Sequence, residues 1–212
     1  TAGFSIVSYT GSGSNATIGH GLGVAPKMII IKDRGDASAW IVYHESIGNG
    51  NLLVLSSNQA ASSTGNFQNT SPTSSVFSIS SSGAVGGSSS PYIAYCFAEV
   101  EGYSRVGWYY GNGSANGTFV HTGFRPAWIL TKNTADAEWW SLFDNKRLGY
   151  NEVNSILSPN DSNAEYSAGG GGIDILSNGF KVRSTSGNFN GSDDAHAYLA
   201  FAEMPFKYAN AR

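Results

Sequence analysis

Hydrophobic residues along this chain mostly alternate with polar residues or form short apolar runs, and helical spacing is almost absent. Gly, Ser, Asn or Pro interrupts the pattern after about eight to twelve residues, which is typical of an all-β sandwich or barrel. The pattern predicts strands near residues 4–10, 16–19, 27–33, 40–44, 51–56, 75–80 and 91–99, and then near 103–110, 117–121, 127–133, 139–143, 153–158, 178–184 and 196–203.

Two short segments are apolar at every position and predict central strands. Residues 28–31 follow Pro26, and residues 128–130 follow Pro126. A strand that is apolar on both faces is expected to be covered on both sides, with its proline at the turn that leads into it.

Two glycine-rich segments, residues 11–14 and 111–114, predict hairpin turns, because Gly and Asn adopt a positive φ at little cost. A phosphate-binding interpretation of these glycines would need a helix directly after them. No helical pattern follows either segment, so we interpret both as structural turns.

The second half of the chain repeats the first. Residues 11–44 align with residues 111–144 without a gap, whereas unrelated segments of this length share only about two or three identities. A duplicated unit of about half the chain is in the size range of one β-sandwich domain. The identical pairs are Gly11/Gly111, Gly13/Gly113, Ser14/Ser114, Gly23/Gly123, Pro26/Pro126, Ile29/Ile129, Lys32/Lys132, Asp36/Asp136, Ala37/Ala137 and Trp40/Trp140.

We therefore predict two tandem, similar antiparallel β-sandwich repeats of jelly-roll-like type, residues 1–102 and 103–212, packed together without a flexible linker. Length differences fall in the loops, where sandwich proteins often carry recognition residues. Residues 206–208 are expected to lie against the second repeat as residues 102–104 lie against the first. The variable loops are residues 57–74, 83–90, 159–172 and 186–194.

One motif, Phe-Ala-Glu, ends both repeats. It places Glu99 and Glu203 at matching positions, and we interpret both as structural anchors. Each glutamate is expected to bind a neighbouring backbone group or the basic residue that follows, which is Arg105 in the first case and Lys207 in the second.

The composition excludes several classes of partner. The 212 residues carry a net charge of −3, and only 13% of them are charged, with no cluster of one sign. A nucleic-acid or anionic-membrane partner would require a basic surface. The apolar runs are too short for a membrane span. The first residue is Thr1 rather than Met, so we expect a part of a longer protein, and the lone Cys96 is expected to be a buried apolar residue.

The polar residues do not suggest catalysis or a bound cofactor. The four histidines are scattered without zinc-ligand spacing, and the acidic residues lack the context of a paired glycosidase site. Asp193 and Asp194 lie in a Gly/Ser/Asn loop and are a weak candidate for a calcium site, although a solvated turn is the preferred interpretation.

The aromatic residues provide the candidate binding site. Neighbouring side chains on a strand point to opposite faces, so one residue of Trp139–Trp140 and one of Tyr109–Tyr110 must face outward. An exposed ring beside polar loops is suited to stacking on a sugar, although an oligomer interface explains the same pattern. The tentative ligand-binding residues are Trp139, Tyr109, Tyr110, Asn112, Asn188 and Phe189.

The chain resembles a repeated β-module of tail-fibre and related virion proteins of bacteriophages, especially marine and cyanobacterial phages. The resemblance implies a virion-surface setting and supplies no catalytic residues. It is carried by residues 4–7 (FSIV), 19–31 (GHGLGVAPKMIII), 92–103 (YIAYCFAEVEGY), 110–114 (YGNGS), 122–130 (TGFRPAWIL) and 201–212 (FAEMPFKYANAR).

These observations lead to the expectation of a non-enzymatic attachment protein that binds a host cell-surface glycan or another receptor by weak, multivalent contacts. Other virion proteins are expected partners, and analogy with fibres suggests a homotrimer. One alternative is a structural or decorating virion protein whose exposed aromatics contact only protein. Another is a glycan-degrading enzyme. A groove lined by amides would favour a ligand, and a flat symmetric patch would favour assembly.

Overall fold

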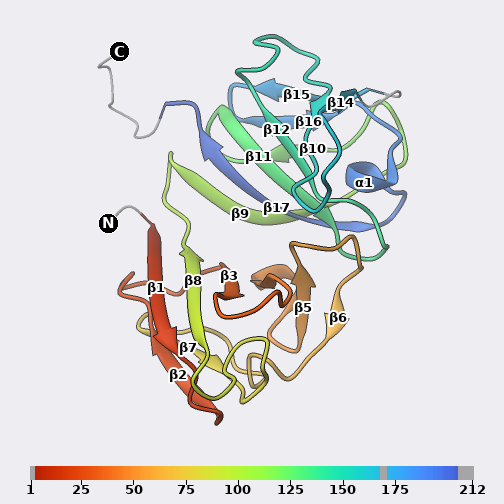
Figure 1. Ribbon diagram of the computed structural model, residues 1–212. Helices are drawn as coiled ribbons and strands as arrows, with labels where there is room; N and C mark the ends of the chain where they lie inside the picture. The colour runs from red at the N-terminus through yellow and green to blue at the C-terminus, as the bar shows by residue number, and fades with distance from the viewer. Residues whose placement is uncertain (1–2, 168–170, 205–212) are drawn as a thin grey trace. The chain divides into compact units, whose positions relative to one another are not determined.

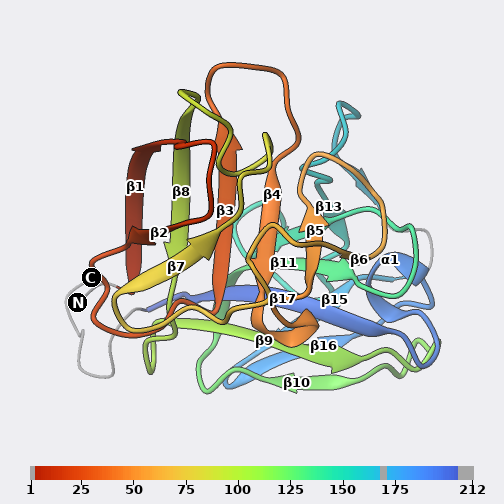
Figure 2. The same cartoon turned by 90° about the horizontal axis from the view of Figure 1, so that it is seen from below.

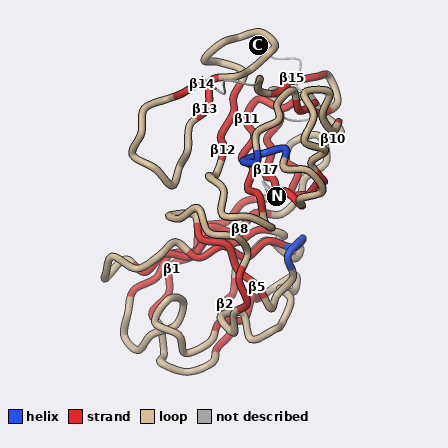
Figure 3. Tube along the Cα trace, turned by 90° about the vertical axis from the view of Figure 1, so that its right-hand side faces the viewer, coloured by secondary structure: helices blue, strands red, loops and turns tan. Residues whose placement is uncertain are grey.

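The computed structural model describes residues 3–167 and 171–204. The predicted all-β class is confirmed: within these described residues, helix occurs only in the 3-10 turn η1 (Glu45–Ile47) and the single turn α1 (Gly187–Asn190), and long loops join the strands (Figure 3). The chain divides into two compact units, residues 1–99 and 100–212. None of the helices in the described ranges has the length and hydropathy needed to cross a membrane.

Unit 1 is a sandwich of a large and a small antiparallel sheet. The large sheet has the order β1-β8-β3-β4-β5-β6, and Figure 2 shows its first five strands side by side; the small sheet pairs β2 with β7. Ile29, Tyr43 and Phe77 meet in the core between the sheets. The strands are β1 (Phe4–Thr10), β2 (Ala16–Gly19), β3 (Met28–Asp33), β4 (Ile41–His44), β5 (Asn51–Val54), β6 (Ser62–Ser63), β7 (Val76–Ile79) and β8 (Pro91–Phe97).

Unit 2 also pairs a main antiparallel sheet with a smaller one, but its strands are divided differently among the sheets. Its main sheet has the order β12-β11-β17-β9 (Figure 1), faced by the sheet β10-β16-β15, and β13 pairs with β14 beside them. Ile129, Phe143 and Phe180 lie in its core. The strands are β9 (Ser104–Tyr110), β10 (Phe119–His121), β11 (Pro126–Asn133), β12 (Ser141–Asp144), β13 (Ser155–Ile156), β14 (Tyr166–Ser167), β15 (Ile173–Leu176), β16 (Gly179–Val182) and β17 (Ala195–Ala202).

In both units the first strand pairs with the last and the second pairs with the one before it. β1 lies beside β8 and β2 beside β7; β9 lies beside β17 and β10 beside β16. Nested pairing of this kind is typical of jelly rolls. The runs at residues 28–31 and 128–130 belong to β3 and β11, each of which has a strand on both sides, so the prediction of central strands is confirmed.

The prediction of hairpins at residues 11–14 and 111–114 was wrong. β1 and β2 lie in different sheets, and so do β9 and β10. Gly13 and Gly113 do have positive φ values of 70° and 62°. These turns do not join two paired strands, because their backbone N–H groups donate to a later loop. Gly13 N, for example, donates to Gly86 O at 3.0 Å.

Two glycines explain why these turns are glycine-rich. A Cβ on Gly11 would lie 2.0 Å from the carbonyl oxygen of Gly87, and a Cβ on Gly111 would lie 2.2 Å from that of Gly191. Real side chains cannot approach a backbone this closely, so only glycine fits at either place.

The pairing registers of the two units correspond. Ile29 lies opposite Tyr43 and Cys96, and Ile129 lies opposite Phe143 and Ala200. Positions near the third strand therefore differ by 100, and positions in the last strand differ by 104. Duplication of a segment remains a prediction, which these matching registers support.

A hydrogen bond present in both units extends this correspondence to the loop before the last strand. Tyr9 Oη donates to Val85 O at 2.7 Å, and Tyr109 Oη donates to Phe189 O at 2.8 Å. The offset of 104 therefore applies to this loop as well, so Asn188 of unit 2 stands where unit 1 has Ala84.

The alignment of residues 11–44 with 111–144 does contain gaps. His20 N donates to Ser75 O, one residue before β7, and Thr122 N donates to Asn178 O, one residue before β16. His20 therefore corresponds to Thr122, which means that unit 2 has two extra residues before Thr122. Between Thr122 and Pro126 it has two residues fewer than unit 1 has between His20 and Pro26. Gly123, with a positive φ, takes the place of Gly21 rather than Gly23.

Candidate functional site

The structure decides which ring of each aromatic pair faces outward. Trp140 is 2% exposed and Trp139 is 37% exposed, while Tyr109 is 5% exposed and Tyr110 is 56% exposed. Tyr109 bonds the carbonyl of Phe189, which is itself buried in the core. Tyr109 and Phe189 were thus wrong as ligand-binding residues, because both pack between the sheets.

Trp139 and Asn188, both predicted as ligand-binding residues, lie together at a surface pocket of unit 2. The pocket has a volume of about 290 Å³ and is open to solvent. The backbone N–H of Trp139 donates to Asn188 Oδ1 at 3.1 Å, so the ring and the amide are fixed beside each other. The lining residues are Trp139, Ser158, Asp161, Asn163, Tyr166 and Asn188.

Local structure positions both walls of the pocket. Ser186 caps α1 by accepting a hydrogen bond from Asn188 N, which places Asn188 in the first turn. On the other wall, Asn160 Oδ1 accepts from Trp140 N at 3.0 Å and holds the loop before β14 against the start of β12.

Arg147 ties the β13–β14 segment to the main sheet. Its guanidinium bonds Asp144 and Glu165, each at 2.5 Å, and Glu165 directly precedes Tyr166 of the pocket. The hydrogen bond from Arg147 lowers the pKa of Glu165. Burial opposes the same effect at Asp144, yet hydrogen bonds from Arg147 and nearby N–H groups keep the pKa of Asp144 below its usual value.

The pocket combines apolar faces with hydrogen-bonding groups. Trp139 and Tyr166 contribute partly exposed rings, while Asn163, Asn188 and Ser158 can both donate and accept. Asp161 accepts hydrogen bonds from Ser162 N and the Asn163 amide, and a carboxylate has capacity for more. Ligand sites typically combine apolar walls with a few placed polar groups, and a sugar ring presents one apolar face and a rim of hydroxyls.

The sequence missed four lining residues. Ser158, Asp161, Asn163 and Tyr166 belong to the segment around β13 and β14. Three of them lie in the loop 159–172, which sequence analysis identified as variable. No spacing in that loop points to a site, because the fold alone brings it against Trp139.

Tyr110 and Asn112 lie outside this pocket. Tyr110 forms an exposed edge-to-face pair with Trp108, with ring centroids 5.2 Å apart. Trp108 was not predicted. Asn112 instead builds its own turn: its amide donates to Asn116 O at 3.1 Å, and its side-chain oxygen accepts from Ser114 N at 3.0 Å.

Asp193 and Asp194, the candidate calcium site, have structural roles in the fold. Asp194 Oδ2 accepts from Asn133 Nδ2 at 2.9 Å, and Asp193 is an exposed turn residue with a φ of 62°. Within residues 3–167 and 171–204, no three His, Cys, Asp or Glu side chains gather in a way that could hold a metal ion.

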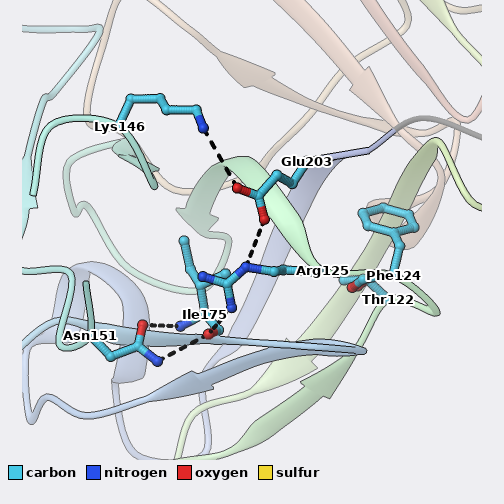
Figure 4. Close-up of polar contacts among 7 residues, drawn as sticks. All are labelled: Thr122, Phe124, Arg125, Lys146, Asn151, Ile175 and Glu203. Carbon is cyan, nitrogen blue, oxygen red and sulfur yellow. Dashed lines mark hydrogen bonds and ion pairs between the residues drawn. The ribbon is translucent and has the colours of Figure 1, made fainter. Parts of the chain in front are cut away.

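The repeated glutamates form ion pairs at the end of both units. One lysine bonds two glutamates in unit 1, whereas one glutamate bonds two basic residues in unit 2. In unit 1, Lys27 bonds both Glu45 and Glu99, at 3.0 and 2.9 Å. In unit 2, Glu203 bonds Arg125 at 2.8 Å and Lys146 at 3.6 Å (Figure 4). Lys27, Arg125 and Lys146 precede the glutamates that they bond, and Lys207 and residues 206–208 lie outside the described residues.

Fold and site together define a two-unit β-sandwich protein with one aromatic-walled pocket described in its second unit. Residues 1–205 match the family described as a domain of unknown function (DUF7483), and the chain belongs to this family. The family match spans both units. No curated protein and no solved structure gives a significant match to the chain.

Proposed function

We propose that this chain is a non-enzymatic attachment protein that binds carbohydrate through the pocket on unit 2. The observation that carries this proposal is the exposed ring of Trp139 held beside the Asn188 amide in a pocket that Tyr166 also lines. A ring can stack on the apolar face of a sugar, while amides and hydroxyls bond its rim. The lining contributes one carboxylate, whereas glycoside hydrolysis usually uses a pair, which supports binding.

A small pocket of this kind is suited to weak binding of a terminal sugar. Avidity from several copies can raise such binding by orders of magnitude without any new contact. This reasoning fits the virion-surface setting that the sequence resemblance implies, in which a fibre presents several chains to a host cell. Homotrimerisation is part of the proposal and rests on that resemblance alone.

A decorating or structural virion protein is the second candidate. The observation that favours it is the exposed pair Trp108–Tyr110 on β9, since exposed aromatic side chains are enriched at protein–protein interfaces. In this case the rings would contact other virion proteins, and the pocket would have no ligand.

The test compares Trp139→Ala with the matched variant Trp108→Ala. Removing a stacking ring is expected to weaken retention on immobilised glycans at least about tenfold, as loss of a well-placed aromatic anchor does. Binding to a glycan array and affinity electrophoresis in polysaccharide gels measure this. Loss of binding only in Trp108→Ala would move the site to β9, and a wild-type protein that binds no glycan would favour the structural alternative.

A further inference from the structure

The charges around the pocket restrict the class of sugar that it can accept. Among its six lining residues, one is charged, and that residue is Asp161. Arg147, which ties the β13–β14 segment to the main sheet, bonds Asp144, Glu165 and the Leu142 carbonyl. A ligand in the pocket therefore meets a carboxylate without an opposing cation in the lining.

We propose that the pocket selects sugars without negative charge and that Asp161 determines this selectivity. This inference rests on the proposed function of the same pocket. Hydroxyl groups of a neutral sugar, or the ammonium group of an amino sugar, can donate to the Asp161 carboxylate. The carboxylate or sulfate of an acidic sugar would face a like charge, which is a direct means of rejecting the wrong partner.

The turn around Asp161 makes its carboxylate a fixed element. Asp161 N donates to Ser158 O at 3.0 Å, so two lining residues close one turn. Ser162 N and the Asn163 amide donate to its side chain, which orients the carboxylate within the same loop. A repelling charge that is held in place discriminates better than one that can turn away from the ligand.

Unit 1 provides an internal precedent for removing this charge. Its matching turn is closed by Ser57 N donating to Val54 O at 3.3 Å, so Ser57 occupies the place of Asp161. Ser57 Oγ accepts from Gln59 N at 3.1 Å, the same kind of bond within the turn. Serine is therefore compatible with this turn, and Asp161→Ser serves as a second variant beside the isosteric Asp161→Asn.

The experiment measures binding of the full chain to dextran and mannan as neutral probes, chitosan oligosaccharides as cationic probes, and alginate and polygalacturonate as anionic probes. We expect the wild type to favour at least one neutral or cationic probe over both anionic probes by about tenfold or more at low salt. Asp161→Asn and Asp161→Ser should reduce this preference to within about threefold. The control Glu101→Gln removes one exposed acid that does not line the pocket and should leave the preference unchanged.

The outcomes separate the two proposals. Wild-type binding to alginate or polygalacturonate that matches binding to neutral probes, and that is lost in Trp139→Ala, overturns the selectivity and leaves the proposed function intact. An unchanged preference in both Asp161 variants, with the protein folded, also overturns it. A wild type that binds none of the five probes overturns the proposed function and this inference with it.

Discussion

The same corner of the sandwich carries two alanines in unit 1 and a pocket in unit 2. Where unit 2 has Trp139 and Asn188, unit 1 has Ala39 and Ala84, and both alanines pack against the core. The strands on either side have matching registers. The two units share these strand registers, so the pocket of unit 2 depends on the side chains of Trp139 and Asn188 and on the loop that contains Asp161.

A second difference lies in the hydrophobic cores of the two units. Tyr9 stacks on Tyr92 in unit 1, with ring centroids 5.1 Å apart, and Tyr109 stacks on His196 in unit 2 at the same distance. Tyr92 Oη donates to Gly83 O at 2.6 Å. The two cores thus keep one stacking geometry with rings of different chemistry, and only the histidine can change its charge near neutral pH.

The largest expected effect tests what the two units share. Gly11→Ala and Gly111→Ala should each destabilise the protein by about 3 kcal/mol, because the new methyl group would clash with a backbone carbonyl. Urea denaturation measures the free energy of unfolding. Gly65→Ala is the control, since nothing lies within 4 Å of its added Cβ. A variant at Gly11 or Gly111 as stable as the control would show that the common turn is not required.

A smaller effect tests the difference between the cores. Burial lowers the pKa of His196 to about 4, and an unfolded histidine titrates near 6.5. Between these values the unfolded chain binds a proton that the folded chain does not, so unit 2 should lose stability as the pH falls from 6.5 to 4. Replacing His196 with the tyrosine of unit 1 should remove this loss.

The measurement for His196→Tyr is the free energy of unfolding at pH 7 and pH 4.5. The variant should gain about 2 kcal/mol relative to the wild type at pH 4.5 compared with pH 7, from the size of the pKa shift. His121→Gln, at an exposed histidine, is the control. If the stability of His196→Tyr depends on pH as that of the wild type does, His196 is not the cause of the loss of stability in acid.

The smallest effect concerns the ion pairs at the end of each unit. Lys27→Met should cost unit 1 only about 0.5 kcal/mol, and the cost should disappear in 1 M NaCl, because partly exposed pairs are screened by salt. Arg125→Met should cost more and keep part of its effect in salt, since Arg125 also donates to Ile175 O at 2.9 Å (Figure 4). If salt changes the cost of Lys27→Met and Arg125→Met by the same amount, the two ion-pair networks contribute equally to the free energy of unfolding.

Much of the fold could be predicted because alternation and turn residues are local signals. Each of the fourteen predicted strand regions overlaps a strand of the structure. Three strands were missed: the two-residue strands β6 and β14, which are too short for a period of two to be visible, and the four-residue strand β15. The pairing of β1 with β8 instead of β2 could not be predicted, since it depends on contacts between distant parts of the chain.

For the candidate site, the sequence predicted Trp139 rather than Trp140 as the ligand-binding ring, and the burial of Trp140 agrees with that choice. Asn188, predicted only as a ligand-binding residue, lies beside Trp139, whereas Tyr109 and Phe189, predicted with it, are buried in the core. An adjacent aromatic pair says that one ring faces out, but the strand register decides which one.

The sequence by itself determined the all-β class, the position of most strands and the glycines that the turns require, because each depends on neighbouring residues. Only the tertiary structure decided that the loop of Asp161 closes over Trp139 and that Asn188 faces the same pocket. These residues are far apart along the chain and meet because β12, the β13–β14 segment and α1 converge at one edge of unit 2. Such convergence follows from strand order and register, which no local pattern specifies.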